Sequence, residues 1–123
     1  PSSSSAASDV YKRQPDYRYE EIDNNKTMYE LYVANSADID RKMILQKDAT
    51  SPGLGSTDMG NISQVFPSIH PMLSIDAKNA VNHQPEYAAA TIAPGGHKAI
   101  YDGAYAMGTT IIDLAEKNLW DNL

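Results

Sequence analysis

The longest periodic stretch of the sequence follows residues 94–96, and it most strongly constrains what the chain can fold into. Its apolar positions recur at helical spacing and are Ile100, Ala104, Met107, Ile111, Leu114 and Ala115. This spacing predicts an amphipathic helix of about five turns, whose apolar stripe must be covered by other elements. Gly103 and Gly108 interrupt the stripe and cost about 1 kcal/mol each relative to Ala, so we expect another element to pack closely there.

Two shorter helices are predicted upstream of this stripe. The first begins at Asp23 or Asn24, either of which can cap a helix, and it fades near residues 37–40. Its positions at helical spacing are Met28, Leu31, Tyr32 and Asn35. The second helix follows the capping residues 56–58 and stops at Pro67, which cannot continue a helix. Its apolar side is expected to consist of Ile62, Val65 and Phe66.

Residues 43–45 and 72–75 are short apolar runs, which predict two buried strands. The order helix, strand, helix, strand, helix favours an α/β fold, in which helices cover a sheet. Two short strands cannot form an independent sheet with both faces covered, so we expect the remaining strands to come from an upstream part of the protein. Without those strands, the long helix should expose Ile100, Met107 and Ile111.

The composition excludes several classes of protein. The chain has 10 basic and 16 acidic residues and a net charge of −6, which disfavours a nucleic-acid binder. The absence of Cys excludes a disulfide framework, a thiolate zinc site and a cysteine nucleophile, and it is compatible with the cytoplasmic location that we expect. No apolar run approaches the roughly 18 residues that span a membrane. Residues 1–14 begin with a Ser/Ala run without periodicity, and we expect them to be a non-native or disordered leader.

Three histidines are candidate metal ligands, although no two have the spacing of a helical metal pair. His83 lies in a loop after a predicted strand, between Asn82 and Glu86, and such loops assemble sites in α/β sheets. His70 directly precedes the same strand and can be structural or functional. His97 is expected to be a solvated residue in the first turn of the long helix.

The glycine-rich segment 55–61 opens the second short helix. A loop of this kind can direct backbone N–H groups and the positive end of a helix dipole at an anion. It can also be a simple capped turn, and the Gly-Lys-Ser/Thr ending of a phosphate-binding Walker loop is missing. Ser56 has no nearby base that would make it a nucleophile.

The motifs are more informative in combination than singly. In order along the chain they are GSTDMGNIS at 55–63, PSIHP at 67–71, NHxxEY at 82–87, and then the long helix. With this order, residues 16–123 resemble the end of the metallo-amidohydrolase family, the aminoacylase and carboxypeptidase G-like zinc peptidases. Within the family, the sequence is most similar to the branch of the aminobenzoyl-glutamate hydrolases and the Xaa-Arg and β-alanyl-lysine dipeptidases.

The resemblance implies a catalytic α/β domain interrupted by a lid domain that also forms a homodimer. Residues 15–23 would be the end of the lid, and residues 24–123 the C-terminal segment of the catalytic domain. His83 matches the last histidine ligand of a site that usually holds two divalent metal ions, expected to be zinc with manganese or cobalt as alternatives. His70 matches a position without a secure role. The residues that match a loop beside the substrate pocket are Gly55, Ser56, Thr57 and Asp58.

The implied activity is hydrolysis of the amide bond of a dipeptide or an N-acyl amino acid by metal-activated water, with a Glu as general base. That Glu and the other metal ligands have no counterparts in this sequence, so we expect the chain alone to be inactive. Two alternatives stay open. The chain can be a non-catalytic structural or interaction segment without a metal, or an anion-binding module that uses residues 55–61. Neither nucleic acid nor a membrane is an expected partner.

Overall fold

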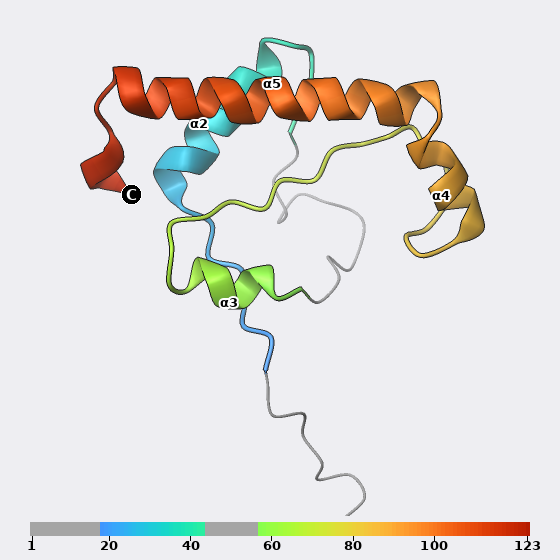
Figure 1. Ribbon diagram of the computed structural model, residues 1–123, viewed down its shortest axis with the longest axis horizontal. Helices are drawn as coiled ribbons and strands as arrows, with labels where there is room; N and C mark the ends of the chain where they lie inside the picture. Colours follow the sequence, from blue (N-terminus) through green and yellow to red (C-terminus); the bar gives the residue numbers. More distant parts are fainter. Residues whose placement is uncertain (1–17, 44–56) are drawn as a thin grey trace, which may run out of the picture.

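The computed structural model describes residues 18–43 and 57–123 of the chain. The helices in these ranges are α2 (Lys26–Ala37), α3 (Met59–Ser63), α4 (Pro85–Thr91), α5 (Pro94–Glu116) and the 3₁₀ helix η2 (Trp120–Asn122). The long helix α5 forms a bar along the molecule, with α2 beside it and α4 at its N-terminal end (Figure 1). An extended segment, residues 68–75, runs from the end of α3 toward α4. None of the described helices combines the length and apolar character needed to cross a membrane.

The predicted α/β fold is wrong for the described residues, which form helices and contain no strand. Residues 71–75 are extended, and their side chains alternate between half-buried and exposed, as they do in a strand that lies on a core. A strand also needs hydrogen bonds to a neighbouring strand, and no second extended segment of the described chain pairs with this one. The apolar pattern therefore predicted the conformation of residues 72–75 but not their pairing. Of the other predicted strand, residues 44 and 45 lie outside the described ranges.

The first predicted helix is present as α2, with a different cap. Asn25, and not Asp23 or Asn24, accepts the Met28 N–H on its side-chain oxygen at 3.0 Å. The helix ends at Ala37, within the predicted limits. Its buried residues are Tyr32, Asn35 and Ser36. Two of these three come from the predicted spacing, so the pattern located the inner side of this helix.

The predicted long helix is confirmed as α5, but most of the predicted stripe does not form the core. Ile100, Met107 and Ile111 are 67%, 52% and 58% exposed, as expected for a helix whose apolar stripe lacks a cover. The residues that α5 buries are instead Gly96, Ala99, Gly103, Ala106, Thr110 and Leu114. We call this set the small-residue face, and only Leu114 in it belongs to the predicted stripe.

Close packing explains Gly103 but not Gly108, the two glycines in the middle of α5. A Cβ atom at Gly103 would lie 3.0 Å from Cδ1 of Leu73, so the extended segment packs directly on the helix backbone, as the sequence predicts. At Gly108 no atom of the described chain would come within 4 Å of such a Cβ. The expected close neighbour is therefore found at Gly103 and not at Gly108.

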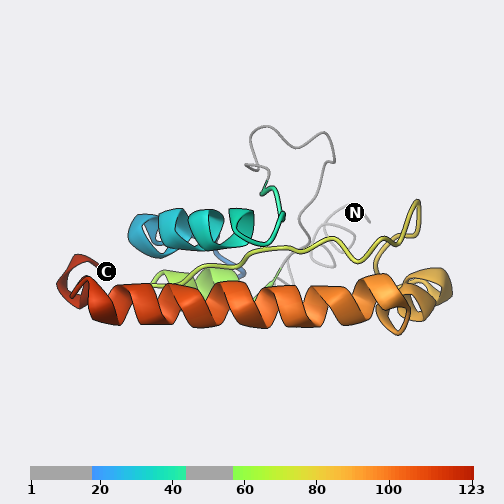
Figure 2. The same cartoon turned by 90° about the horizontal axis from the view of Figure 1, so that it is seen from above.

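The helices α2 and α5 run antiparallel side by side (Figure 2). Thr27, in the first turn of α2, donates from Oγ1 to the Asn122 carbonyl just beyond the end of α5, at 3.3 Å. Asn35, in the last turn of α2, donates from Nδ2 to Oδ2 of Asp113 at 3.0 Å. Polar contacts thus fix the register of the helix pair, while the buried apolar side chains are those of Tyr32 on α2 and of Ala99, Ala106 and Leu114 on α5.

Candidate functional site

The loop matched to a substrate pocket lies before α3, and the structure describes two of its four residues. Gly55 and Ser56 lie outside the described ranges. Oγ1 of Thr57 accepts the Met59 N–H at 3.3 Å, so Thr57 supplies the predicted capping chemistry. Asp58 is exposed and makes no side-chain cap bond to α3. Its carboxylate is therefore not required to start the helix and is open to solvent.

Helix α3 is held against residues 18–23 by backbone-directed contacts. A Cβ atom at Gly60 would overlap the Glu20 carbonyl, so the glycine of the GSTDMGNIS motif permits this close approach. Oγ of the buried Ser63 accepts the Asp23 N–H at 2.9 Å and donates to the Gly60 carbonyl at 2.7 Å. Two amide side chains extend the contact, Asn61 to the Arg18 carbonyl and Gln64 to the Glu21 carbonyl, each at 2.8 Å.

The predicted apolar side of this helix is exposed instead. Ile62, Val65 and Phe66 are 46%, 72% and 62% exposed. The apolar spacing therefore misidentified the packed side, because Gly60 and Ser63 allow the backbone of residues 18–23 to approach where larger side chains would not.

His70 and His83 lie at opposite ends of the extended segment. The backbone N–H of His70 donates to Oδ1 of Asn24 at 3.1 Å, next to the start of α2, and the residue is exposed. His83 is exposed in the turn before α4 and has a φ of 67°, a left-handed conformation that is uncommon outside glycine. Figures 1 and 2 show α3, which residues 57 and 58 precede, well apart from α4, which His83 precedes.

His83 is a single candidate metal ligand. Within residues 18–43 and 57–123, no group of three His, Cys, Asp or Glu residues could hold a metal ion. Catalytic zinc sites generally use three protein ligands and a water. The described residues therefore do not fit a metal ion on their own, and we derive no metal-bound step from them. His97 is exposed in the first turn of α5, as the sequence predicts.

Sequence reasoning missed a cluster of charges beside α5, which we call the ion triad: Arg41, Lys98 and Asp102. Nε of Arg41 and Nζ of Lys98 each lie 2.6 Å from Oδ2 of Asp102. Hydrogen bonds from Lys98 and then Arg41 lower the pKa of the Asp102 carboxyl below its usual value. The spacing of Lys98 and Asp102, four residues apart on a helix, was visible in the sequence. Arg41 comes from the loop after α2, 61 residues away from Asp102, and no local signal connects the two.

Comparisons with known proteins support the family that the motifs indicate. No family model matches the chain, and no solved structure matches it significantly. Human Xaa-Arg dipeptidase is 33% identical over 96 residues, which cover 76% of this chain and 21% of that protein. Mouse Xaa-Arg dipeptidase is 30% identical over 99 residues, 80% of this chain and 23% of that protein. Over these residues the chain is similar to dipeptidases.

The chain spans about a fifth of the length of these curated relatives. The identity, together with the ordered motifs, supports the resemblance to the metallopeptidase family. The relatives carry the name of a hydrolase of dipeptides.

Proposed function

We propose that this chain is a segment of a metal-dependent amidohydrolase that cleaves the amide bond of a dipeptide or an N-acyl amino acid. The single observation that carries the proposal is the similarity of about four-fifths of the chain to Xaa-Arg dipeptidases. A dipeptide with a C-terminal Arg is accordingly the first substrate to test. Residues 24–123 would belong to the catalytic domain, and residues 15–23 to the end of a lid domain that forms the homodimer.

In this proposal His83 supplies one ligand to a site of divalent metal ions, with zinc as the first candidate. Two features of the described structure support the assignment. The imidazole is exposed, so it is available to groups outside this chain, and it sits on a tight turn with a left-handed backbone. Unusual backbone conformations of this kind cluster at functional sites. The remaining ligands and the general base would come from the rest of the enzyme.

Residues 55–58 would line the substrate pocket in the complete enzyme. Asp58 supports this assignment because its carboxylate is exposed and is not used to cap α3. We expect Asp58→Ala in the complete enzyme to reduce dipeptide turnover far more than the free energy of unfolding. Loss of folding with unchanged specific activity of the folded fraction would show that Asp58 has a structural role only.

The test of the proposed function uses a longer protein that contains this chain, with metal content and dipeptide hydrolysis as separate readouts. His83→Ala should remove most of the bound metal and most of the hydrolysis, because an imidazole ligand cannot be replaced by a methyl group. His97→Ala is the matched control, since it removes another exposed histidine and should change neither readout. Full metal content in the His83→Ala protein would contradict the assignment.

The alternative of a non-catalytic interaction segment is supported by the exposed apolar side chains of α5. It predicts that the longer protein binds no metal and hydrolyses no dipeptide, whatever residue stands at position 83. Metal content of the unsubstituted longer protein therefore separates the two functions before any variant is made.

A further inference from the structure

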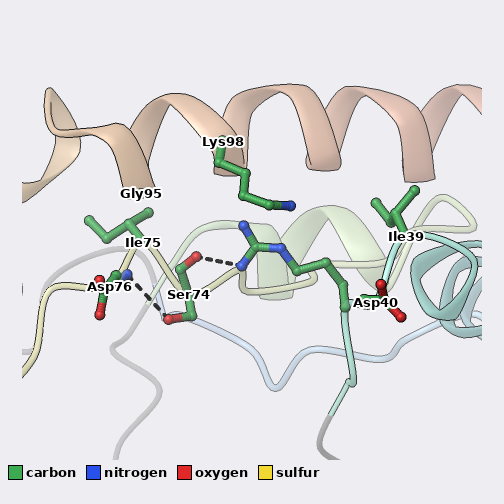
Figure 3. Close-up of a pocket in the computed structure, with 8 residues that line it drawn as sticks. Ile39, Asp40, Ser74, Ile75, Asp76, Gly95 and Lys98 are labelled. Atoms are coloured by element: carbon green, nitrogen blue, oxygen red, sulfur yellow. Dashed lines mark hydrogen bonds between the residues drawn. The ribbon is translucent and has the colours of Figure 1, made fainter.

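A cavity of about 430 Å³, widely open to solvent, lies between the loop that follows α2, residues 74–76 and the first turns of α5 (Figure 3). Its volume lies within the range of about 300–1,000 Å³ that small-molecule sites occupy. Ile39 and Ile75 contribute apolar surface to its walls, and charged side chains from three separate elements line it. His83, Thr57 and Asp58 do not line this cavity, so it is distinct from the residues of the proposed function.

Positive charge reaches the cavity from the ion triad. Arg41 and Lys98 line the cavity and share the single carboxylate of Asp102, so the triad has a net charge of +1. The guanidinium of Arg41 has five N–H donors. Within the described chain, Asp102 accepts one of them and the Ser74 carbonyl, at 2.7 Å, accepts another. The Lys98 side chain is 62% exposed. Both cations therefore keep donors for an anionic group of a ligand.

Negative charge reaches the same cavity from Asp40 and Asp76, which lie on two different loops. In the part of the chain that the structure describes, neither carboxylate takes part in an ion pair. Figure 3 shows Asp40 and Asp76 on opposite sides of the cavity, with the Lys98 side chain above and between them. The lining thus places separate positive and negative groups around one small space.

We propose that this cavity binds a small zwitterion, a free amino acid or a dipeptide. Its carboxylate contacts Arg41 and Lys98, and its ammonium group contacts Asp76 or Asp40. A simple anion would meet the two aspartates, and a simple cation would meet the two basic side chains. A zwitterion is the class of ligand that offers each group a partner of opposite charge. Because exposed ion pairs are weak, we expect an affinity in the millimolar range.

The test is an NMR titration of the 123-residue chain with glycylglycine and with two blocked forms of the same peptide. Glycylglycine should produce saturable shifts in the backbone amides of residues 39–41, 74–76 and 95–98. N-acetylglycylglycine lacks the ammonium group and glycylglycinamide lacks the carboxylate, so each should bind at least about threefold more weakly. If either blocked peptide bound as tightly as glycylglycine, one charged group would be sufficient for binding, and the proposal would be overturned. So would the absence of saturable shifts at these residues.

Two substitutions with matched controls locate the site. Lys98→Gln and Asp76→Asn should each weaken glycylglycine binding by about three- to fivefold. Asn readily adopts the left-handed backbone found at Asp76, so the loop should persist. Lys117→Gln removes the other lysine that pairs with an aspartate of α5, and Asp38→Asn removes an exposed carboxylate outside the cavity; both should leave binding unchanged.

Unchanged binding in the Lys98→Gln and Asp76→Asn proteins, with helix content retained in circular dichroism, would overturn the proposal. If Asp76→Asn lost its helix content, Asp40→Asn together with Lys98→Gln would decide in its place. These outcomes do not depend on His83. Zwitterion binding in the cavity can therefore be disproved without affecting the proposed hydrolase function, and the hydrolase function can be disproved without affecting zwitterion binding.

Discussion

The two faces of α5 differ mainly in the size of their side chains, and Leu114 is the one large side chain on the packed face. The small-residue face contacts α2 and the extended segment, and its Ala106 and Leu114 are each 1% exposed. The other face carries Ile100, Met107 and Ile111, each more than half exposed. Hydrophobicity alone would have assigned the faces the other way round. Small side chains let a neighbouring element approach closely, and α2 packs here through its buried residues Tyr32, Asn35 and Ser36.

The largest expected effect distinguishes the two faces by removing one large side chain from each. Leu114→Ala should lower the free energy of unfolding by about 2–5 kcal/mol, because it leaves a cavity in the core. Ile111→Ala, on the exposed face, should change it by no more than about 0.5 kcal/mol. Urea unfolding followed by circular dichroism measures both values. Equal losses for the two variants would show that the exposed face is packed in solution.

A smaller effect is expected when Gly103 and Gly108, the two glycines in the middle of α5, are compared. Gly108→Ala should raise the free energy of unfolding by about 0.5–1 kcal/mol, since Ala favours a helix and the new methyl group meets no described atom within 4 Å. Gly103→Ala should gain less, because its methyl group would lie 3.0 Å from Cδ1 of Leu73 and that side chain must shift. The same unfolding experiment serves both variants, and an equal gain at the two positions would contradict the close contact with Leu73.

The smallest effect concerns pH and the ion triad. The pKa of Asp102 is lowered in the folded chain, first by the hydrogen bond from Lys98 and then by that from Arg41. In the unfolded chain we expect a value of about 3.9. The stabilisation is therefore complete above that pH and is lost as the pH falls toward the lowered folded value, because the unfolded state binds a proton first.

The free energy of unfolding, measured from neutral pH down to about pH 3, shows whether stability is lost as the pH falls below the pKa of Asp in the unfolded chain. Asp102→Asn should reduce the loss of stability in acid. The pKa of Asp113 is also lowered, first by Lys117 and then by Asn35, so the double variant with Asp113→Asn should reduce the loss further. An acid profile that neither substitution alters would contradict the contribution of these carboxylates.

Local patterns predicted α2, α3 and α5, but they predicted neither α4 nor η2 and did not predict how the helices pack. The 3.6-residue spacing and the flanking Pro and Gly residues were sufficient for α5. For α2 the spacing located the helix and its end, but the capping residue is Asn25 and not the predicted Asp23 or Asn24. The packed faces of α3 and α5 depend on how closely the backbone of Glu20 approaches Gly60 and the side chain of Leu73 approaches Gly103, which spacing does not encode. Residues 72–75 have the alternation of a strand, yet pairing requires a partner that the described chain does not provide.

The candidate site, like the fold, was predicted only in part. The ordered motifs indicated the peptidase family, and the comparisons with dipeptidases support it. The ion triad was not predictable, because Arg41 and Asp102 are distant in sequence and meet only when α2 packs on α5. Where His83 and residues 55–58 act in a complete enzyme stays a prediction.

Thiol labelling of two nearby alanines on α5 tests the assignment of its faces most directly. The chain has no Cys, so Ala104→Cys and Ala106→Cys each introduce a unique thiol. Ala104 is exposed, whereas Ala106 is 1% exposed. We predict that the thiol at position 104 reacts at the rate measured in denaturant. The thiol at position 106 should react many times more slowly and become fully reactive only when the chain unfolds. Equal rates in the native chain, or faster labelling at position 106, would contradict the small-residue face as the core of this molecule.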